Sequence, residues 1–301
     1  MRPKPLWVAA LLLLTACRAS AEADASATDA RVLQEVERLA TVQAKLAAGS
    51  VPDIVKESVK PNGEALERVR TATSPQLRLY RLRDAFIGIE AVSFVAAQKD
   101  AAKSVDTFIA LWKASPTQSI PTPAGAPLLH AALVEQASNK AEKLYRASLP
   151  YGKADGPFSG VYYLGEAHAT AAFGRFVASL GVRNAEEPPK AGALEKAIDG
   201  LETDMLAAFD KDPAAPAMIG VSVRLKEARE LFERGSLAGA TLLLLEARLS
   251  YGRNTEPKVS GDVKPPADLP KDSMAELWRN SDNPLAIRDV LPLYATLRRQ
   301  S

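Results

Sequence analysis

The chain has 301 residues with 38 basic and 36 acidic side chains, and 47% of its residues are hydrophobic, which suffices for one large or two small domains. Its basic and acidic residues nearly balance, with a formal net charge of +2, which argues against nucleic acid as a partner held by bulk electrostatic attraction. Its single cysteine, Cys17, excludes an internal disulfide bond and a zinc site built from cysteines.

The first sixteen residues have the three parts of an export signal. Arg2 and Lys4 give a positive start, an apolar run occupies residues 6–14, and small residues precede Cys17. The run is nine residues long, whereas a membrane-spanning helix needs roughly 20. Residues 1–16 are therefore predicted to be a cleaved signal peptide.

The tetrad Leu14-Thr15-Ala16-Cys17 resembles the lipobox of bacterial lipoproteins. The resemblance implies a diacylglycerol on the Cys17 sulfur, cleavage before Cys17 and acylation of the new amine, palmitate being a typical acyl group. Arg18 stands where an aspartate often signals inner-membrane retention, so the resemblance favours the outer membrane, facing the periplasm. No other cofactor is expected. An ordinary cleaved secretory signal is the alternative.

Beyond the signal the chain is electrically neutral and begins with a polar stretch. Loss of Arg2 and Lys4 leaves 36 basic and 36 acidic residues. Residues 17–29 consist of alanine, serine, threonine and charged residues after the cysteine, with no large apolar side chain to bury. This composition predicts a flexible tether between the lipid and a helical domain that spans residues 30–253.

The first half of that domain has helical periodicity. Apolar residues at three- and four-residue spacing predict a helix that ends at Gly49 (Val32, Leu33, Val36, Leu39 and Leu46). A weaker helix is expected over residues 63–71. Ser74-Pro75 has the pattern of an N-cap followed by proline in the first turn, and this helix is expected to reach about residue 114 with a break near Asp100.

The second half alternates helices with proline- or glycine-rich loops. Loops are expected at 115–127 and 150–160, and a proline-rich linker at 254–270. Helices are expected at 128–149, 161–180, 193–209, 217–234 and 236–251. Residues 271–301 are predicted to form C-terminal helices packed on the domain. The fold class is all-α, built from antiparallel helical hairpins that form either a solenoid or a bundle.

Residues 228–247 carry the clearest repeat pattern. Gly235 stands at the expected turn, Leu237 and Leu244 are large apolar positions, and the small residues Ala240 and Ala247 lie seven apart. This segment resembles the second half of a tetratricopeptide (TPR) repeat, with a weaker echo at residues 163–168. The resemblance implies a TPR-like α-solenoid in which small residues allow close helix packing. An unrelated helical bundle or α-solenoid is the alternative.

Catalytic and metal-binding patterns are absent from the sequence. It contains no His-Glu-x-x-His pair, no Gly-x-Ser-x-Gly elbow and no phosphate-binding glycine loop, so no catalytic residue or metal ligand is predicted. Tyr162, Glu166 and His168 form the most site-like cluster and are candidate groove residues; His130 is the second histidine. A local excess of arginine is a candidate surface for lipid headgroups or acidic partners, or simply a solvated helix face (Arg68, Arg70, Arg78, Arg81 and Arg83).

These features together predict a binding protein rather than an enzyme. We expect an exported lipoprotein, attached to the membrane by its lipid, whose helical domain binds or scaffolds protein partners in the cell envelope. No nucleic acid partner is expected. Two alternatives stay open: an envelope enzyme that acts on peptidoglycan or another envelope polymer with Glu166 as acid, and a helical solute-binding lipoprotein.

Overall fold

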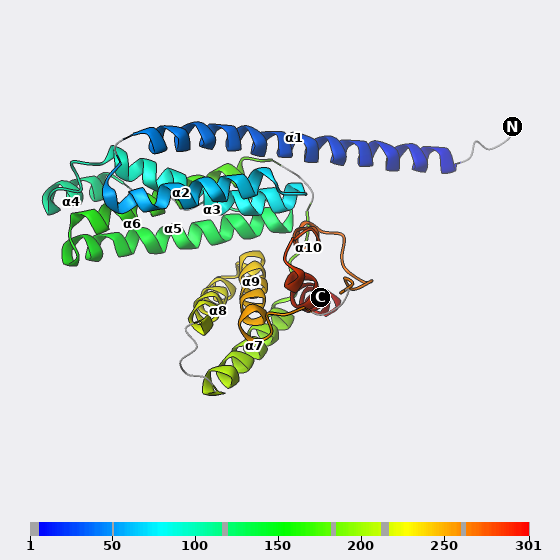
Figure 1. Cartoon of the computed structure of the whole chain (residues 1–301). Coiled ribbons are helices and arrows are strands. Elements are labelled where there is room, and N and C mark those ends of the chain that lie inside the picture. The colour runs from blue at the N-terminus through cyan, green and yellow to red at the C-terminus, as the bar shows by residue number, and fades with distance from the viewer. Residues whose placement is uncertain are drawn as a thin grey trace.

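A computed structural model describes residues 6–49, 51–115, 120–181, 185–211, 217–259 and 263–300. The described ranges contain helices and no strand, which confirms the all-α class (Figure 1). The helices are α1 (Leu6–Ala48), α2 (Asp53–Arg70), α3 (Pro75–Ala97), α4 (Val105–Ala114), α5 (Leu128–Ala154), α6 (Pro157–Ala178), α7 (Ala191–Lys211), α8 (Ala217–Glu233), α9 (Leu237–Thr255), α10 (Ser273–Arg279), the π-helical turn η1 (Ala286–Val290) and α11 (Leu291–Arg299).

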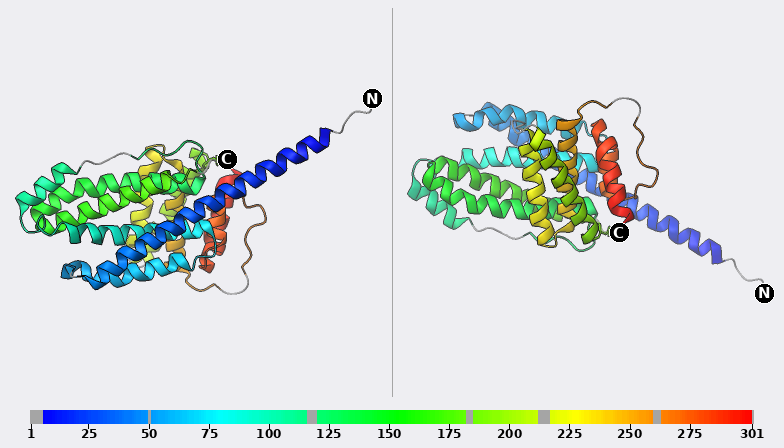
Figure 2. Two further views of the ribbon diagram at one scale, coloured as in Figure 1. Left: turned by 90° about the horizontal axis from the view of Figure 1, so that it is seen from above. Right: turned by 90° about the horizontal axis from the view of Figure 1, so that it is seen from below.

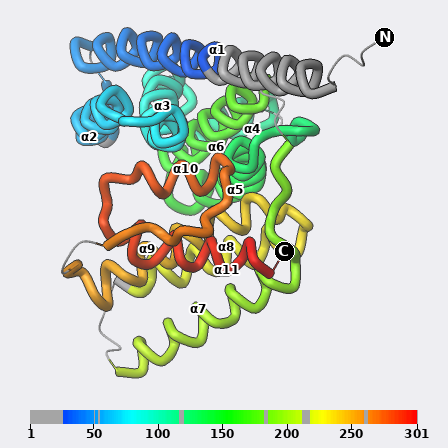
Figure 3. Tube along the Cα trace, turned by 90° about the vertical axis from the view of Figure 1, so that its right-hand side faces the viewer, coloured from blue at the N-terminus to red at the C-terminus, as the bar shows by residue number. Residues whose placement is uncertain are grey.

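The helices pack as hairpins in successive layers. Figure 3 shows α1 above α2 and α3, then α5 and α6, then α8 and α9, with α7 at the far side. α5 and α6 form the most extensive antiparallel pair, and α3 packs on α6. The main hydrophobic core lies among α1 to α6 and also takes in side chains of α9, α10, η1 and α11; it includes the fully buried Leu82, Leu133 and Phe173.

α1 is one continuous helix that packs on α2 and α3 (Figure 2). Residues 17–29, for which the sequence predicts a flexible tether, lie inside this continuous helix rather than in an irregular segment. The physical reason is composition: the stretch contains five alanines and neither glycine nor proline, and alanine is the strongest helix former. Asp29, which pairs with Arg78 of α3, lies twelve residues after Cys17, or about 18 Å along a helix.

Several predicted boundaries hold. α1 ends at Ala48, just before Gly49. The side chain of Ser74 accepts a hydrogen bond from the Leu77 N–H at 3.2 Å and so caps α3, as expected. The expected break near Asp100 separates α3 from α4.

Two predicted boundaries are wrong. The helix expected at residues 63–71 begins ten residues earlier, because Pro61 is accommodated inside α2. The loop expected at 150–160 shrinks to Asp155 and Gly156, because α5 continues through Pro150 to Ala154 and α6 begins with Pro157 in its first turn. The extended loop expected at 115–127 is non-helical where described, and its residues 116–119 lie outside the described residues.

A second, smaller core forms among α7, α8 and α9. α9 joins the two cores, because Leu242 and Leu245 pack into the main core while Leu243 and Leu244 pack into the second. Its side chains are therefore buried nearly all round, as expected of a helix between two layers.

The α8–α9 hairpin turns at Gly235, where the repeat pattern places its glycine. Gly235 has φ +76°, and the Ser236 N–H donates to the Leu231 carbonyl at 2.9 Å while the Gly235 N–H donates to the Phe232 carbonyl at 2.9 Å. This is the Schellman arrangement of a helix C-terminus. The hairpin is thus formed as expected, and the packing of the whole chain fits a bundle of hairpins.

Replacement of this turn glycine is a direct test of the hairpin. Gly235→Ala is expected to lower the free energy of unfolding by about 1–2 kcal/mol, since a side chain disfavours a left-handed backbone. Gly192→Ala is the matched control, because a methyl group there meets no neighbouring atom and φ is not positive. Urea unfolding measures both. Equal stability of the two variants would contradict the expected strain.

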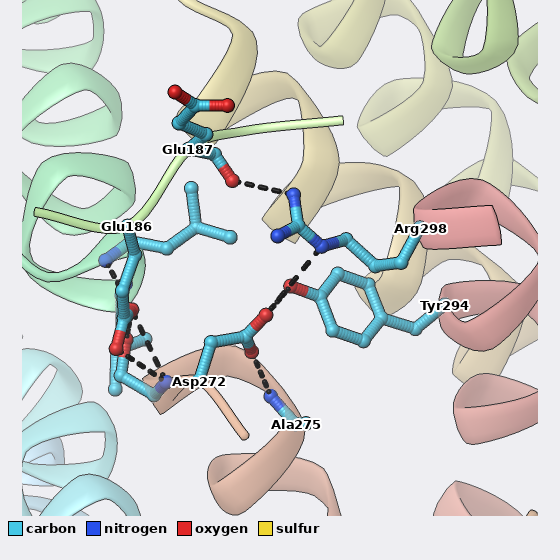
Figure 4. Close-up of polar contacts among 9 residues, drawn as sticks. Glu186, Glu187, Asp272, Ala275, Tyr294 and Arg298 are labelled. Atoms are coloured by element: carbon cyan, nitrogen blue, oxygen red, sulfur yellow. Dashed lines mark hydrogen bonds and ion pairs between the residues drawn. The ribbon is translucent and has the colours of Figure 1, made fainter. Parts of the chain in front are cut away.

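Polar contacts fasten the C-terminal helices to the body (Figure 4). Glu186, which precedes α7, accepts hydrogen bonds from the N–H groups of Leu128 at 2.7 Å and Ser273 at 3.1 Å, at the starts of α5 and α10. Asp272 accepts from the Ala275 N–H at 2.9 Å and from the Tyr294 hydroxyl at 2.7 Å. Burial, and then the nearby Asp272, raise the pKa of Tyr294. α10 and α11 are therefore integral to the fold; the proline-rich segment before them is non-helical where described.

Candidate functional site

Of the three candidate groove residues, Tyr162 and Glu166 interact with each other, and His168 packs elsewhere. Tyr162, Glu166 and His168 all lie on α6. Burial, followed by the charge of Glu166, raises the pKa of Tyr162, whose hydroxyl bonds to Glu166. His168 instead stacks on Phe94 of α3 with ring centroids 5.0 Å apart, and its Nε2 has no hydrogen-bond partner among the described residues. Burial and then Arg175 lower the pKa of His168, so it is a neutral packing residue.

The remaining sequence candidates are also accounted for by packing and pairing. His130 lies in the first turn of α5, where burial lowers its pKa to about 4. Most of the arginine-rich segment is paired with acids: Arg70 with Glu37 and Glu67, Arg78 with Asp29, Arg81 with Asp282, and Arg83 with Asp84 and Glu246. Most of these acidic partners lie far away in the sequence. The segment therefore has an excess of arginine in the sequence, although its arginines are largely paired with acids in the fold.

A cavity of about 470 Å³ lies where the two cores meet. Its walls come from α3, α5, α6, α8 and α9. A volume in this range is typical of sites for small molecules, which are lined mainly by apolar groups with a few placed polar ones. The apolar walls include Ile87, Leu133, Phe173, Leu231 and Leu243.

A desolvated charge pair forms one side of the cavity. The Arg83 Nη1 donates to Glu246 Oε1 at 2.8 Å and to Gln136 Oε1 at 3.2 Å, and the Tyr80 hydroxyl donates to the same Glu246 oxygen at 2.9 Å. The Arg83 guanidinium also lies over the Tyr80 ring, 4.8 Å from its centroid. Burial is the largest single influence and lowers the pKa of Arg83, but Glu246, Tyr80 and Asp84 together outweigh it and hold that pKa well above its ordinary value. Burial, and then Glu246, raise the pKa of Tyr80.

Two buried polar side chains of the cavity wall lack partners. Asn139 of α5 is 5% exposed and Thr170 of α6 is 1% exposed. Asn139 Oδ1 and Thr170 Oγ1 have no hydrogen-bond partner in the part of the chain that the structure describes. Such groups are costly unless something satisfies them, so they mark the position where a ligand or water would bond.

Two further cavities, of about 450 and 470 Å³, lie around α7 and are less site-like. Neither is lined by a buried side-chain oxygen or nitrogen that lacks a partner within the described ranges. None of the three cavities is lined by Tyr162, Glu166 or His168. The cavity between the two cores, which we call the central cavity, is therefore the candidate site.

Sequence reasoning missed nearly all of this site. Arg83 belongs to the local arginine excess, and Asn139, Thr170 and Glu246 carry no local motif. The single hint was an apolar helix, α9, that contains Glu246 between Leu245 and Ala247, because a carboxylate in such a run needs a buried partner.

Searches among protein families, curated proteins and solved structures found no match to this chain. Across the described ranges, no helix is long and apolar enough to cross a membrane. Those same ranges contain no cluster of three or more histidine, cysteine, aspartate or glutamate side chains that could hold a metal ion. Among the described residues, the central cavity is thus the feature that best supports a function.

Proposed function

We propose that the protein is an exported lipoprotein, held at a membrane by a lipid on Cys17, whose helical domain binds a small ligand in the central cavity. The observation that carries the binding function is the pair of unpartnered oxygens of Asn139 and Thr170 inside a cavity of about 470 Å³. The lipobox-like tetrad Leu14-Thr15-Ala16-Cys17 supports the anchor.

The ligand-binding proposal is tested by a plug at the rim of the central cavity. Val223 lines the cavity and is 50% exposed, so Val223→Trp adds bulk there with little burden on the fold. Ser222→Trp on the same helix is the matched control, because Ser222 is exposed and does not line the cavity. Thermal unfolding is measured with a panel of amino acids, peptides, sugars and organic anions.

A ligand at 100 times its dissociation constant stabilises the folded state by about 2.7 kcal/mol, or about 5–10 °C in melting temperature for a domain of this size. We expect that shift in the wild type and in Ser222→Trp, and its loss in Val223→Trp. A ligand that stabilises Val223→Trp as much as the control would place binding outside the central cavity.

The anchor is tested by removing its thiol. Cys17→Ala is expected to abolish incorporation of labelled palmitate and to release the chain from the membrane fraction, because two or more acyl chains are what make attachment stable. Thr15→Ser is the matched control, since it keeps a small residue before the cysteine. Equal labelling of wild type and Cys17→Ala would contradict the proposal.

A protein partner is the second candidate function, and one observation favours it. Four large apolar side chains on either side of the connection between α7 and α8 are exposed: Leu206 and Phe209 near the end of α7, and Ile219 and Val223 in the first half of α8, with exposures from 42% to 63%. Exposed apolar groups that lie together are typical of interaction sites. By contrast, the enzyme alternative receives no such support, since Glu166 lines none of the three cavities.

A further inference from the structure

Charged residues of α5 and α8 form ion pairs with each other away from the central cavity, but not where they line it. At one end the two helices are joined by the ion pair of Lys143 with Glu230, and Arg234 just beyond α8 reaches Glu142 at 3.3 Å. One turn earlier on each helix stand Lys140 and Glu227, which both line the cavity. Neither has a hydrogen-bond or ion-pair partner among the residues described.

A third charged group at the cavity is also without a counter-ion. Arg224 of α8 lines the cavity, and its Nη1 donates at 2.9 Å to the carbonyl of Gly220 in its own helix. Within the described ranges no carboxylate lies at ion-pair distance from it. Arg224 and Glu227 are three residues apart and so are neighbours on one face of α8. The cavity therefore has two uncompensated cations and one uncompensated anion at its edge.

The inner wall adds hydrogen-bonding capacity and an apolar surface. Asn139 Oδ1 is an acceptor that suits an N–H donor, and the Thr170 hydroxyl both donates and accepts. Phe173 and Leu133 are fully buried and line the same space. A matching ligand has an ammonium group, a carboxylate and an apolar part.

We propose, on the basis of the proposed function, that the central cavity binds a zwitterion of the amino-acid or short-peptide class. Arg224 and Lys140 receive the carboxylate, Glu227 and Asn139 receive the ammonium group, and the apolar side chain lies against Phe173. Charge-assisted hydrogen bonds of this kind are stronger than neutral ones, and their distribution over both ends of the ligand gives specificity.

Calorimetry on the full-length lipoprotein in detergent tests this assignment with leucine, the dipeptide Ala-Leu and the tripeptide Ala-Ala-Leu. N-acetyl-leucine lacks the ammonium group, and leucine amide lacks the carboxylate. We expect saturable binding of at least one zwitterion, at least tenfold weaker binding of its capped forms, and similar losses in Arg224→Ala and Glu227→Gln. Lys226→Ala, an exposed change on the same helix outside the cavity, is expected to bind as the wild type does.

The outcomes separate the ligand class from the cavity itself. Stronger binding of leucine than of the peptides would assign a free amino acid, and the reverse order a peptide terminus. Equal affinity of capped and uncapped compounds would overturn the zwitterion. Binding of a different compound from the panel, lost in Val223→Trp, would also overturn it while leaving the proposed function intact. No saturable binding of any compound by a folded wild type would overturn both.

Discussion

Glu246→Ala is expected to lower the free energy of unfolding by about 3–5 kcal/mol, because it leaves the desolvated Arg83 without its buried counter-ion. Glu246 is 8% exposed and the Arg83 side chain 20% exposed, so water does little to replace the lost partner. The Tyr80 hydroxyl loses its acceptor in the same step. Since Arg83 and Tyr80 belong to α3 and Glu246 to α9, the variant also weakens the junction of the two cores.

Asp84→Ala is the matched control for this experiment. Asp84 bonds to the same guanidinium, at 3.1 Å from Nε, but its side chain is 70% exposed, and surface ion pairs contribute roughly 0–1 kcal/mol. The double variant Arg83→Leu with Glu246→Leu is expected to recover much of the loss, because it removes both charges. Urea unfolding provides all three values. A cost of Glu246→Ala no greater than that of Asp84→Ala would show that the pair is not desolvated.

The second large effect is expected at Phe108, which anchors α4. Phe108 is fully buried, and its ring fills a slot between the end of α5 and the start of α6. The slot exists because Gly152 and Gly160 face each other there without side chains. A methyl group on Gly152 would lie 2.1 Å from the ring Cε1, and one on Gly160 would lie 2.4 Å from Cζ.

Phe108→Ala is expected to cost about 3–5 kcal/mol, the usual loss for a buried phenylalanine that leaves a cavity. Val105→Ala on the same helix is the control, because Val105 is 37% exposed and its loss is expected to stay near 0.5 kcal/mol. Gly152→Ala is expected to destabilise by itself and to cost less when Phe108 is already alanine, since the clash is then relieved. Additive effects of Phe108→Ala and Gly152→Ala would contradict the slot.

Local patterns in the sequence sufficed for most helices. The spacing of Val32, Val36 and Leu39 predicts the buried face of α1, and all three are buried. Ser74 and Gly235 act through bonds to residues a few positions away, so their cap and turn are predictable from neighbours alone. Pro150 misled the prediction because proline usually ends a helix, whereas here α5 continues for one turn beyond it.

The candidate site could not be predicted in this way. Arg83 and Glu246 are 163 residues apart and meet only because α9 lies between the two cores. Asn139 and Thr170 face one space only after α5 and α6 pack against α8 and α9. The site therefore depends on long-range packing, whereas the proposed lipid anchor rests on the contiguous residues Leu14-Thr15-Ala16-Cys17, which are read from the sequence alone.

Native mass spectrometry of the lipoprotein, extracted from membranes and supplied with Ala-Leu, tests both halves of the proposed function in one measurement. The wild type is expected to have the mass of a chain that begins at Cys17 and carries lipid, and to hold one bound ligand. Val223→Trp is expected to have the same lipid and no ligand. An unmodified Cys17 would contradict the anchor, and bound ligand at equal occupancy in the two proteins would contradict binding in the central cavity.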